Sequence, residues 1–114
     1  MGDWSGQEKR KHKRVALHTA VECRSGQAAL TCEVENISIN GLLIRTPDPF
    51  PQHEELALRF SIPSGRVIEC RSRVAHMVPD AFMGVEFVGL APEAAAVIEQ
   101  YIAATPALQG KGKR

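Results

Sequence analysis

The sequence has few aromatic side chains and no long apolar run, and each shortage excludes a class of protein. Aromatic residues make up only 5% of the chain, too few for the stacking platforms on which small barrels bind single-stranded nucleic acid. No apolar run approaches the roughly 20 residues that a membrane-spanning helix needs. Residues 1–14 contain no apolar stretch, so we expect no signal peptide and a cytoplasmic location.

The residues that most often carry catalysis or bind metals are also scarce. The cysteines are odd in number, lack metal-site spacing, and fall on the apolar side of strand patterns, as buried small hydrophobic residues would. The histidines show no metal-ligand spacing, and neither a nucleophile elbow nor a glycine-rich phosphate loop is present. We therefore expect no enzyme, no metal and no cofactor, and a reducing compartment. The residues concerned are Cys23, Cys32, Cys70, His12, His18, His53 and His76.

The charge is small in total but unevenly placed. The chain has 14 Lys and Arg against 13 Asp and Glu, a formal net charge of +1. Eight of the cations lie in two terminal segments, residues 9–14 and 111–114, so residues 15–110 carry a net charge of about −5. A weakly acidic body with a basic arm argues against a broad nucleic-acid-binding face.

Alternation of apolar and polar residues predicts six β-strands. In the second of them, for example, the apolar residues Leu30, Cys32 and Val34 are separated by polar ones. Residues 46–51 contain three prolines and must form a loop, because proline cannot join a sheet ladder. Six antiparallel strands with short turns and one apolar face each predict an all-β fold, a small six-stranded antiparallel barrel. The strands are expected at about 15–23, 28–36, 41–46, 55–62, 68–74 and 83–87.

The last element has a helical period. Pro92 at the first helical position and Glu93 in the first turn mark a helix start, and apolar residues then recur at helical spacing. This helix, expected over 92–103 and ended by Pro106, would pack one stripe on an end of the barrel. The predicted organisation is a flexible N-terminus over 1–8, a barrel domain over 9–104 with a basic arm at 9–14 and the C-terminal helix, and a basic disordered tail over 105–114.

A polar hinge at residues 36–41 (Asn-Ile-Ser-Ile-Asn-Gly) separates the second and third predicted strands. Asn40-Gly41 is a common turn signal, and Gly41 permits a positive φ or the close approach of another backbone or a ligand. A turn does not need Asn36 and Ser38, which are two residues apart and so leave the same face of an extended segment. We interpret the hinge as a place where a polar group is held.

The basic arm offers complementary groups. Arg10 and Arg14 are four residues apart, so a turn in the arm can present both guanidinium groups to one ligand. A guanidinium forks onto phosphate or onto the O6/N7 edge of guanine, and it stacks on purine faces. With the amide and the hydroxyl of the hinge, the two arginines are typical of a purine-phosphate site. A solvated arm without a ligand is the alternative reading of these residues alone.

The two motifs, taken together and in this order, resemble the signature of the PilZ domain family. That signature is RxxxR before the first strand and (D/N)xSxxG at the end of the second, and residues 10–14 and 36–41 fit its two halves. Residues 84–87 (Gly-Val-Glu-Phe) are similar to the closing G-(I/V)-x-F strand of the family, and the resemblance covers about residues 8–103. It implies a bacterial receptor for the second messenger cyclic di-GMP.

The resemblance implies a role for each residue of the signature. Arg10 and Arg14 would bind phosphates and the Hoogsteen edges of guanine. Asn36 and Ser38 would bond to polar groups of guanine, and Gly41 would give the ligand room. Position 36 departs from the commoner aspartate, and a neutral amide offers only one acceptor oxygen, so its bond to guanine N–H groups is expected to be weaker.

Two further positions are implied as ligand contacts. Lys9 stands just before the arginine pair, where a cation in the family tends to accompany binding of an intercalated cyclic di-GMP dimer. His76 lies where some relatives place an aromatic side chain that stacks on guanine. An exposed strand residue without a ligand is the alternative reading of His76.

We therefore expect a cyclic di-GMP receptor and adaptor that is not an enzyme. The six basic residues at 9–14 should be mobile without ligand, because like charges repel. An anionic dinucleotide would pin this arm against the hinge and offer a new surface to a protein effector, which the sequence does not identify. The resemblance implies a role in motility or biofilm formation. The alternatives are a PilZ-like scaffold for pilus or motility assembly that binds no nucleotide, and a barrel that binds RNA or DNA.

Overall fold

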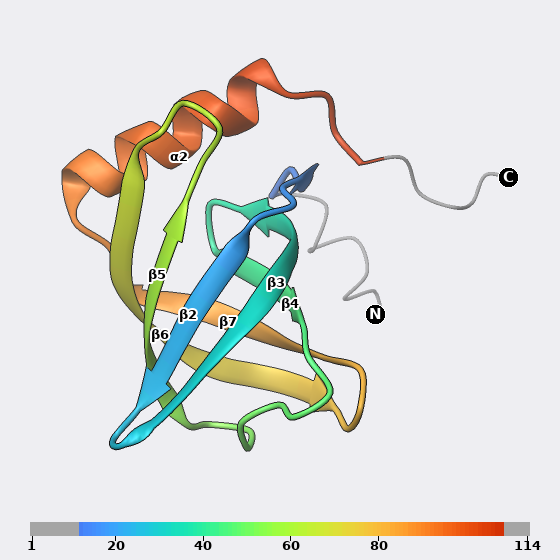
Figure 1. Cartoon of the computed structure of the whole chain (residues 1–114). Coiled ribbons are helices and arrows are strands. Elements are labelled where there is room, and N and C mark those ends of the chain that lie inside the picture. The colour runs from blue at the N-terminus through green and yellow to red at the C-terminus, as the bar shows by residue number, and fades with distance from the viewer. Residues whose placement is uncertain (1–11, 109–114) are drawn as a thin grey trace, which may run out of the picture.

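The computed structural model describes residues 12–108, in which strands wrap into a barrel and one helix lies across an end of it (Figure 1). The strands of this part of the chain are β1 (Val15–Ala16), β2 (Ala20–Ser25), β3 (Ala28–Ser38), β4 (Gly41–Arg45), β5 (Glu55–Ser61), β6 (Val67–Val78) and β7 (Phe82–Gly89). The helix is α2 (Pro92–Ala104).

The barrel closes through β3 and β4. Hydrogen bonds join neighbouring strands in the order β1-β3-β2-β5-β6-β7-β4, and β4 pairs with β3 as well. Each of these pairings is antiparallel. The predicted all-β fold, a six-stranded antiparallel barrel with a C-terminal helix, is therefore confirmed, and β1 is an extra short strand alongside β3.

The prediction of one strand over 15–23 is wrong, because the chain is divided there into β1 and β2. Both parts pair with β3, which is 11 residues long. Between them the ladder is irregular, and the Val34 N–H donates to the Thr19 carbonyl at 2.9 Å. At the same level, β3 shifts register against β4 between Val34 and Asn36. The irregular β3 backbone accounts for the break between β1 and β2.

The core lies inside the barrel and follows the predicted alternation. In β5, for example, the apolar residues at 56, 58 and 60 are buried and the residues between them are exposed. Removal of this apolar surface from water is the main term that stabilises the fold. The helix, predicted over 92–103, spans Pro92–Ala104, and it buries Ile98 and Ile102 against the barrel core.

The three cysteines are buried free thiols, as predicted. Burial raises the pKa of Cys23 to about 12, with a further contribution from its neighbour Cys32. Burial also raises the pKa of Cys70 to about 11. Both thiols are therefore protonated at neutral pH and behave as small apolar side chains.

The segment after α2 returns to the start of the barrel. The Leu108 N–H donates to the Arg14 carbonyl at 2.9 Å. Leu108, which lies in the segment 105–114 expected to be a disordered tail, is thus bonded to the basic arm. Residues 109–114 of that tail and the predicted flexible N-terminus over 1–8 lie outside the described residues. Within residues 12–108, the structure contains no helix with the length and apolarity needed to span a membrane.

Candidate functional site

Five strands contribute one residue each to a continuous row across the outside of the barrel. In ladder order these residues are Ala16, Asn36, Leu43, Gly84 and His76, and each pairs directly with the next. They come from β1, β3, β4, β7 and β6, so the row exists only in the closed barrel. It places Asn36 and His76, which are far apart in the sequence, on one surface.

Two β-bulges turn Asn36 and His76 to the outside. β3 advances from Val34 to Asn36 while β4 advances by one residue, and β6 advances from Val74 to His76 while β7 advances by one. Val34 and Val74 are fully buried. Because side chains alternate along a strand, one extra residue moves the next side chain to the opposite face. Without the bulges, Asn36 and His76 would follow the two valines into the core.

Arg14 reaches this row from the basic arm. Its Nη1 donates a hydrogen bond of 2.7 Å to Oδ1 of Asn36. The residue as a whole is exposed, but neighbouring groups partly bury its guanidinium, and this desolvation lowers the pKa of Arg14. The acceptor is a neutral amide, so this contact leaves the positive charge of Arg14 uncompensated. An anion bound here would be attracted by that charge.

The imidazole ring of His76 lies over Gly84. A Cβ atom on Gly84 would be within 3.0 Å of three ring atoms, so a glycine is needed for the ring to lie there. Phe82 meets the same ring edge to face, with ring centroids 6.2 Å apart and planes at 81°. This aromatic contact orients the imidazole. His76 is nevertheless exposed, as a side chain that stacks on a flat ligand has to be.

Two residues of the predicted hinge have partners within the protein. Gly41 faces β7 so closely that a Cβ atom would clash with the carbonyl oxygen of Val85, and its φ is not positive. The structure therefore explains this glycine by the approach of another backbone. Ser38 is only 1% exposed, and its Oγ accepts the Asn40 N–H at 3.1 Å. The hydroxyl thus stabilises the turn between β3 and β4.

Several residues predicted from the sequence line one hollow of about 470 Å³. They are Arg14, Asn36, Gly41 and His76, whereas Ser38 does not contribute to the wall. The predicted contacts Lys9 and Arg10 lie outside the described residues. The rest of the wall is formed by Asn40, Leu42, Leu43, Ala75, Phe82, Gly84, Val85 and Glu86.

Three of these wall residues carry chemistry that the sequence analysis missed. Leu43 and Phe82 give apolar surface against which a flat ring can lie, and Glu86 gives a carboxylate. Glu86 pairs directly with Gly41 across the β4–β7 ladder. The register of that ladder would have identified Glu86, but β4 and β7 are distant in sequence and their pairing leaves no local signal.

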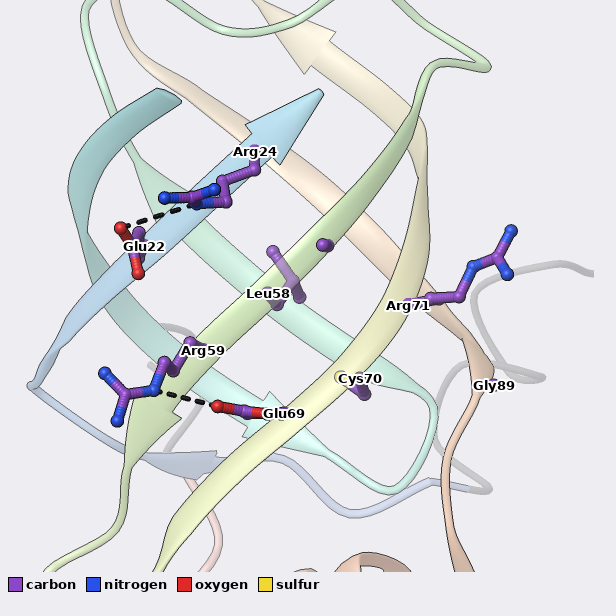
Figure 2. Close-up of a pocket in the computed structure, with 9 residues that line it drawn as sticks. Glu22, Arg24, Leu58, Arg59, Glu69, Cys70, Arg71 and Gly89 are labelled. Atoms are coloured by element: carbon purple, nitrogen blue, oxygen red, sulfur yellow. Dashed lines mark hydrogen bonds and ion pairs between the residues drawn. The ribbon is translucent and has the colours of Figure 1, made fainter. Parts of the chain in front are cut away.

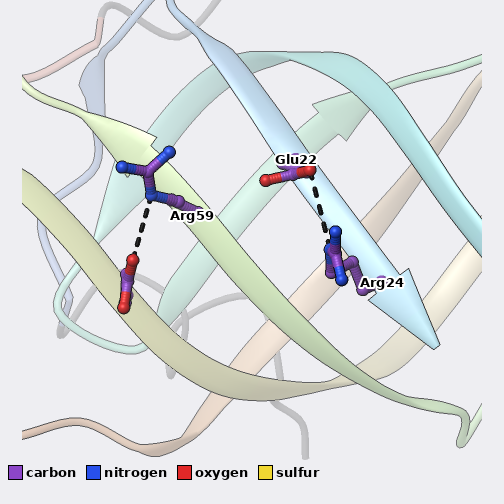
Figure 3. Close-up of polar contacts among 4 residues, drawn as sticks. Glu22, Arg24 and Arg59 are labelled. Atoms are coloured by element: carbon purple, nitrogen blue, oxygen red, sulfur yellow. Dashed lines mark hydrogen bonds and ion pairs between the residues drawn. The ribbon is translucent and has the colours of Figure 1, made fainter. Parts of the chain in front are cut away.

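A second hollow, of about 610 Å³, lies on the outer face of β2, β5 and β6 (Figure 2). Its charged residues pair with oppositely charged neighbours, two of these pairs being shown in Figure 3. The pairs are Arg24 with Glu22 at 3.6 Å, Arg59 with Glu69 at 3.0 Å, and Arg71 with Glu55 at 3.0 Å. Each arginine in the wall of this larger hollow therefore already has a carboxylate partner, whereas Arg14 in the other hollow bonds to a neutral amide.

Comparison with known families identifies the domain. The model of the PilZ domain matches residues 8–104, which include the basic arm, the barrel and the helix. The chain therefore belongs to the PilZ domain family. A search of curated proteins found no match.

Solved structures of PilZ proteins share the fold. The Bacillus subtilis inhibitor of motility, MotI/DgrA, has a TM-score of 0.76 at 21% identity over 84% of this chain, which spans only 50% of that protein. The PilZ domain of YcgR from Escherichia coli, solved with c-di-GMP, has a TM-score of 0.67 at 11% identity over 85% of this chain and 91% of that one. PlzA of Borreliella burgdorferi, also solved with c-di-GMP, has a TM-score of 0.66 at 17% identity over 85% of this chain and 42% of that one. At these identities the likeness establishes the fold.

Proposed function

We propose that this PilZ domain is a receptor for cyclic di-GMP and that the hollow beside Arg14 and His76 is its ligand site. The observation that carries the proposal is the hydrogen bond of 2.7 Å from Arg14 to Asn36, which joins the two halves of the signature at one place. Two proteins of similar fold were solved with c-di-GMP. Family membership and these neighbours support the choice of ligand.

Arg14 provides a positive charge and forked donors. A guanidinium has five N–H donors, and the bond to Asn36 is made by Nη1. Donors that remain can fork onto a phosphate or onto the O6/N7 edge of guanine. Arg10, four residues earlier, provides a second guanidinium to the same ligand. Lys9 adds a cation that suits two intercalated ligand molecules rather than one.

In the hollow, one aromatic side chain (His76) and two polar ones (Asn36 and Glu86) contact a guanine base. The exposed imidazole of His76 stacks on the base, a contact of about 1–3 kcal/mol for an aromatic side chain. Because Oδ1 of Asn36 accepts from Arg14, its amide N–H groups are the ones that bond to guanine acceptors. Glu86 then provides the carboxylate oxygens that the N1–H and N2–H donors of guanine require.

Ligand binding changes the state of the basic arm. The six basic residues at 9–14 repel one another, and a dinucleotide with two phosphates neutralises that repulsion. Arg14 already bonds to Asn36 without ligand, so binding orders the part of the arm that precedes it. The ordered arm forms a new surface for a protein effector, so the domain works as an adaptor. The fold is shared with a protein named as an inhibitor of motility, and control of motility is accordingly the output that we favour.

Titration calorimetry with cyclic di-GMP tests the ligand and the site together. The loss of a charge-assisted hydrogen bond costs about 1.5–3 kcal/mol, so Arg14→Ala should bind at least about tenfold more weakly than wild type. Arg66→Ala is the matched control, because Arg66 is exposed, lies in the β5–β6 turn and does not line the hollow. It should bind within about twofold of wild type.

Each other outcome has a distinct meaning. Equal binding by wild type and Arg14→Ala would contradict the assigned site. Two ligands per chain would support the dimer that Lys9 suggests, and one would contradict it. If wild type binds no cyclic di-GMP at high micromolar concentration, the receptor proposal fails.

A PilZ-like scaffold that acts only through protein contacts is the second candidate. It is favoured by Gly41 and Ser38, whose contacts with Val85 and Asn40 serve the fold whether or not a ligand binds. A failed titration of a folded wild-type protein would support this candidate. Recovery of a stable complex with a motility or pilus protein in the absence of nucleotide would then support it directly.

A further inference from the structure

The two edges of β1 have different partners. On one edge, β1 pairs with β3, and the Leu17 N–H just beyond it donates to the Glu35 carbonyl at 3.3 Å. Backbone groups of alternate residues in an extended strand point to the same edge, so the carbonyls of Arg14 and Ala16 point away from β3. Both of these carbonyls accept hydrogen bonds from the end of the chain. The donors are the Leu108 N–H, at 2.9 Å from the Arg14 oxygen, and the Tyr101 hydroxyl, at 2.7 Å from the Ala16 oxygen.

The donors are held in place by the end of α2. The helix is anchored to the barrel by Ile98 and Ile102, which are buried in its core. The helix ends at Ala104. The next residue, Thr105, donates its hydroxyl to the Tyr101 carbonyl at 2.6 Å and its N–H to the Ile102 carbonyl at 3.2 Å. The chain then runs from α2 past β1 (Figure 1). We refer to residues 101–108 as the C-terminal segment. Because α2 is anchored to the barrel core, this segment contacts the arm from a fixed position.

The C-terminal segment bonds to the backbone of Arg14 itself and to that of Ala16, two residues further on. Arg14 reaches Asn36 through its side chain, and Ala16 is the direct ladder partner of the same asparagine. We propose that the C-terminal segment positions Arg14 in the hollow, with the Leu108 N–H and the Tyr101 hydroxyl as the positioning groups. This inference rests on the proposed function, because it concerns the same site.

Coupling between the segment and the site acts in both directions. A ligand that bonds to Arg14 favours the arm geometry that the C-terminal segment also favours, so each strengthens the other by the same factor. The end of α2, which lies on the edge of β1 away from β3, therefore responds to whether the nucleotide site is occupied. One neutral hydrogen bond corresponds to a change of about threefold to tenfold in affinity.

Leu108→Pro in the full chain tests the inference, because proline has no N–H to donate to Arg14. We expect Leu108→Pro to bind cyclic di-GMP about threefold to tenfold more weakly than wild type. Ala107→Pro is the matched control, because within residues 12–108 the Ala107 N–H makes no backbone hydrogen bond. It should bind as wild type does. Tyr101→Phe, which removes only the hydroxyl, should weaken binding in the same direction as Leu108→Pro.

A double-mutant cycle separates positioning from general loss of stability. If the Leu108 N–H acts through Arg14, the effect of Leu108→Pro on affinity disappears in an Arg14→Ala background. An equal loss in both backgrounds, or affinity unchanged by Leu108→Pro while wild type binds, would overturn the inference.

A measurement without ligand keeps the inference independent of the receptor proposal. In the free protein, the NMR signals of the Asn36 side-chain amide report its bond to Arg14. Leu108→Pro should shift these signals and Ala107→Pro should leave them in place. If wild type binds no cyclic di-GMP but Leu108→Pro shifts them, the receptor proposal fails and the positioning role stands. If neither variant shifts them, the positioning role fails as well.

Discussion

Gly41→Ala is the substitution that most directly tests how the barrel is closed. A Cβ atom at this position would clash with the carbonyl oxygen of Val85 on β7, so the β4 and β7 backbones would have to separate. Overpacking of this kind costs about 1–3 kcal/mol, and we expect about 2–3 because backbone, rather than the end of a flexible side chain, must move. For a domain of about 100 residues, each kcal/mol lowers Tm by about 4–8 °C. Tm should therefore fall by about 8–24 °C.

Gly89→Ala is the control for this experiment. A Cβ atom on Gly89 would meet Cβ of Arg71 at 3.7 Å, an ordinary contact, and the φ of Gly89 is not positive. Because alanine reduces the entropy of the unfolded chain, Gly89→Ala should be neutral or up to about 1 kcal/mol more stable. Thermal and urea unfolding without ligand, followed by circular dichroism, measure both variants. If Gly41→Ala melts within about 2 °C of wild type, the close approach of β7 is not what requires this glycine.

Three further predictions concern the hollow and the buried thiols. Glu86→Gln removes a carboxylate acceptor and should weaken cyclic di-GMP binding by about tenfold in calorimetry; unchanged affinity would exclude Glu86 as a guanine contact. Gly84→Ala should displace the His76 ring and weaken binding as much as His76→Ala does, while changing Tm by less than about 5 °C, because a side chain rather than backbone moves; wild-type affinity in Gly84→Ala would contradict stacking by His76. Burial raises the pKa of the Cys23 thiol to about 12 and that of the Cys70 thiol to about 11 in the folded state. As the pH rises above about 9, these two thiols therefore lose their protons in the unfolded chain before they do so in the folded protein. The free energy of unfolding should then fall by up to about 1.4 kcal/mol per pH unit for each thiol between pH 9 and 11, and a flat urea midpoint over that range would contradict this.

Alternation predicted the barrel because each strand buries one face, and a buried face requires period-two patterning. Besides the strand predicted over 15–23, it failed at two strand ends for one physical reason. The predicted strands over 28–36 and 68–74 stop where the β-bulges begin, whereas β3 continues to Ser38 and β6 to Val78. A bulge adds a residue, and the alternation resumes out of phase beyond it. In the sequence, a bulge therefore appears only as a break in the alternation, which is indistinguishable from the end of a strand.

The site was predictable only in part, because its residues meet through pairing between distant strands. The resemblance to the PilZ signature implies that Arg14 and Asn36 act on one ligand, and the structure joins the two side chains by a hydrogen bond. Sequence spacing could not show that Gly84 makes room for His76, since this depends on the register of β6 with β7. Sequence spacing also could not show that Leu108 bonds to Arg14, because a contact between the two ends of the domain leaves no local pattern in the sequence.

The PilZ signature in this chain combines two kinds of requirement. Gly41 and Ser38 satisfy the barrel, one by admitting the Val85 carbonyl and the other by accepting the Asn40 N–H. These contacts would be needed in a PilZ domain that binds nothing, so they carry little information about a ligand. Arg14 does carry such information, because an exposed guanidinium directed at a neutral amide contributes at most a modest amount to stability. Its charge and remaining donors are explained better by a ligand than by the fold, and the receptor proposal therefore depends on Arg14 rather than on the signature as a whole.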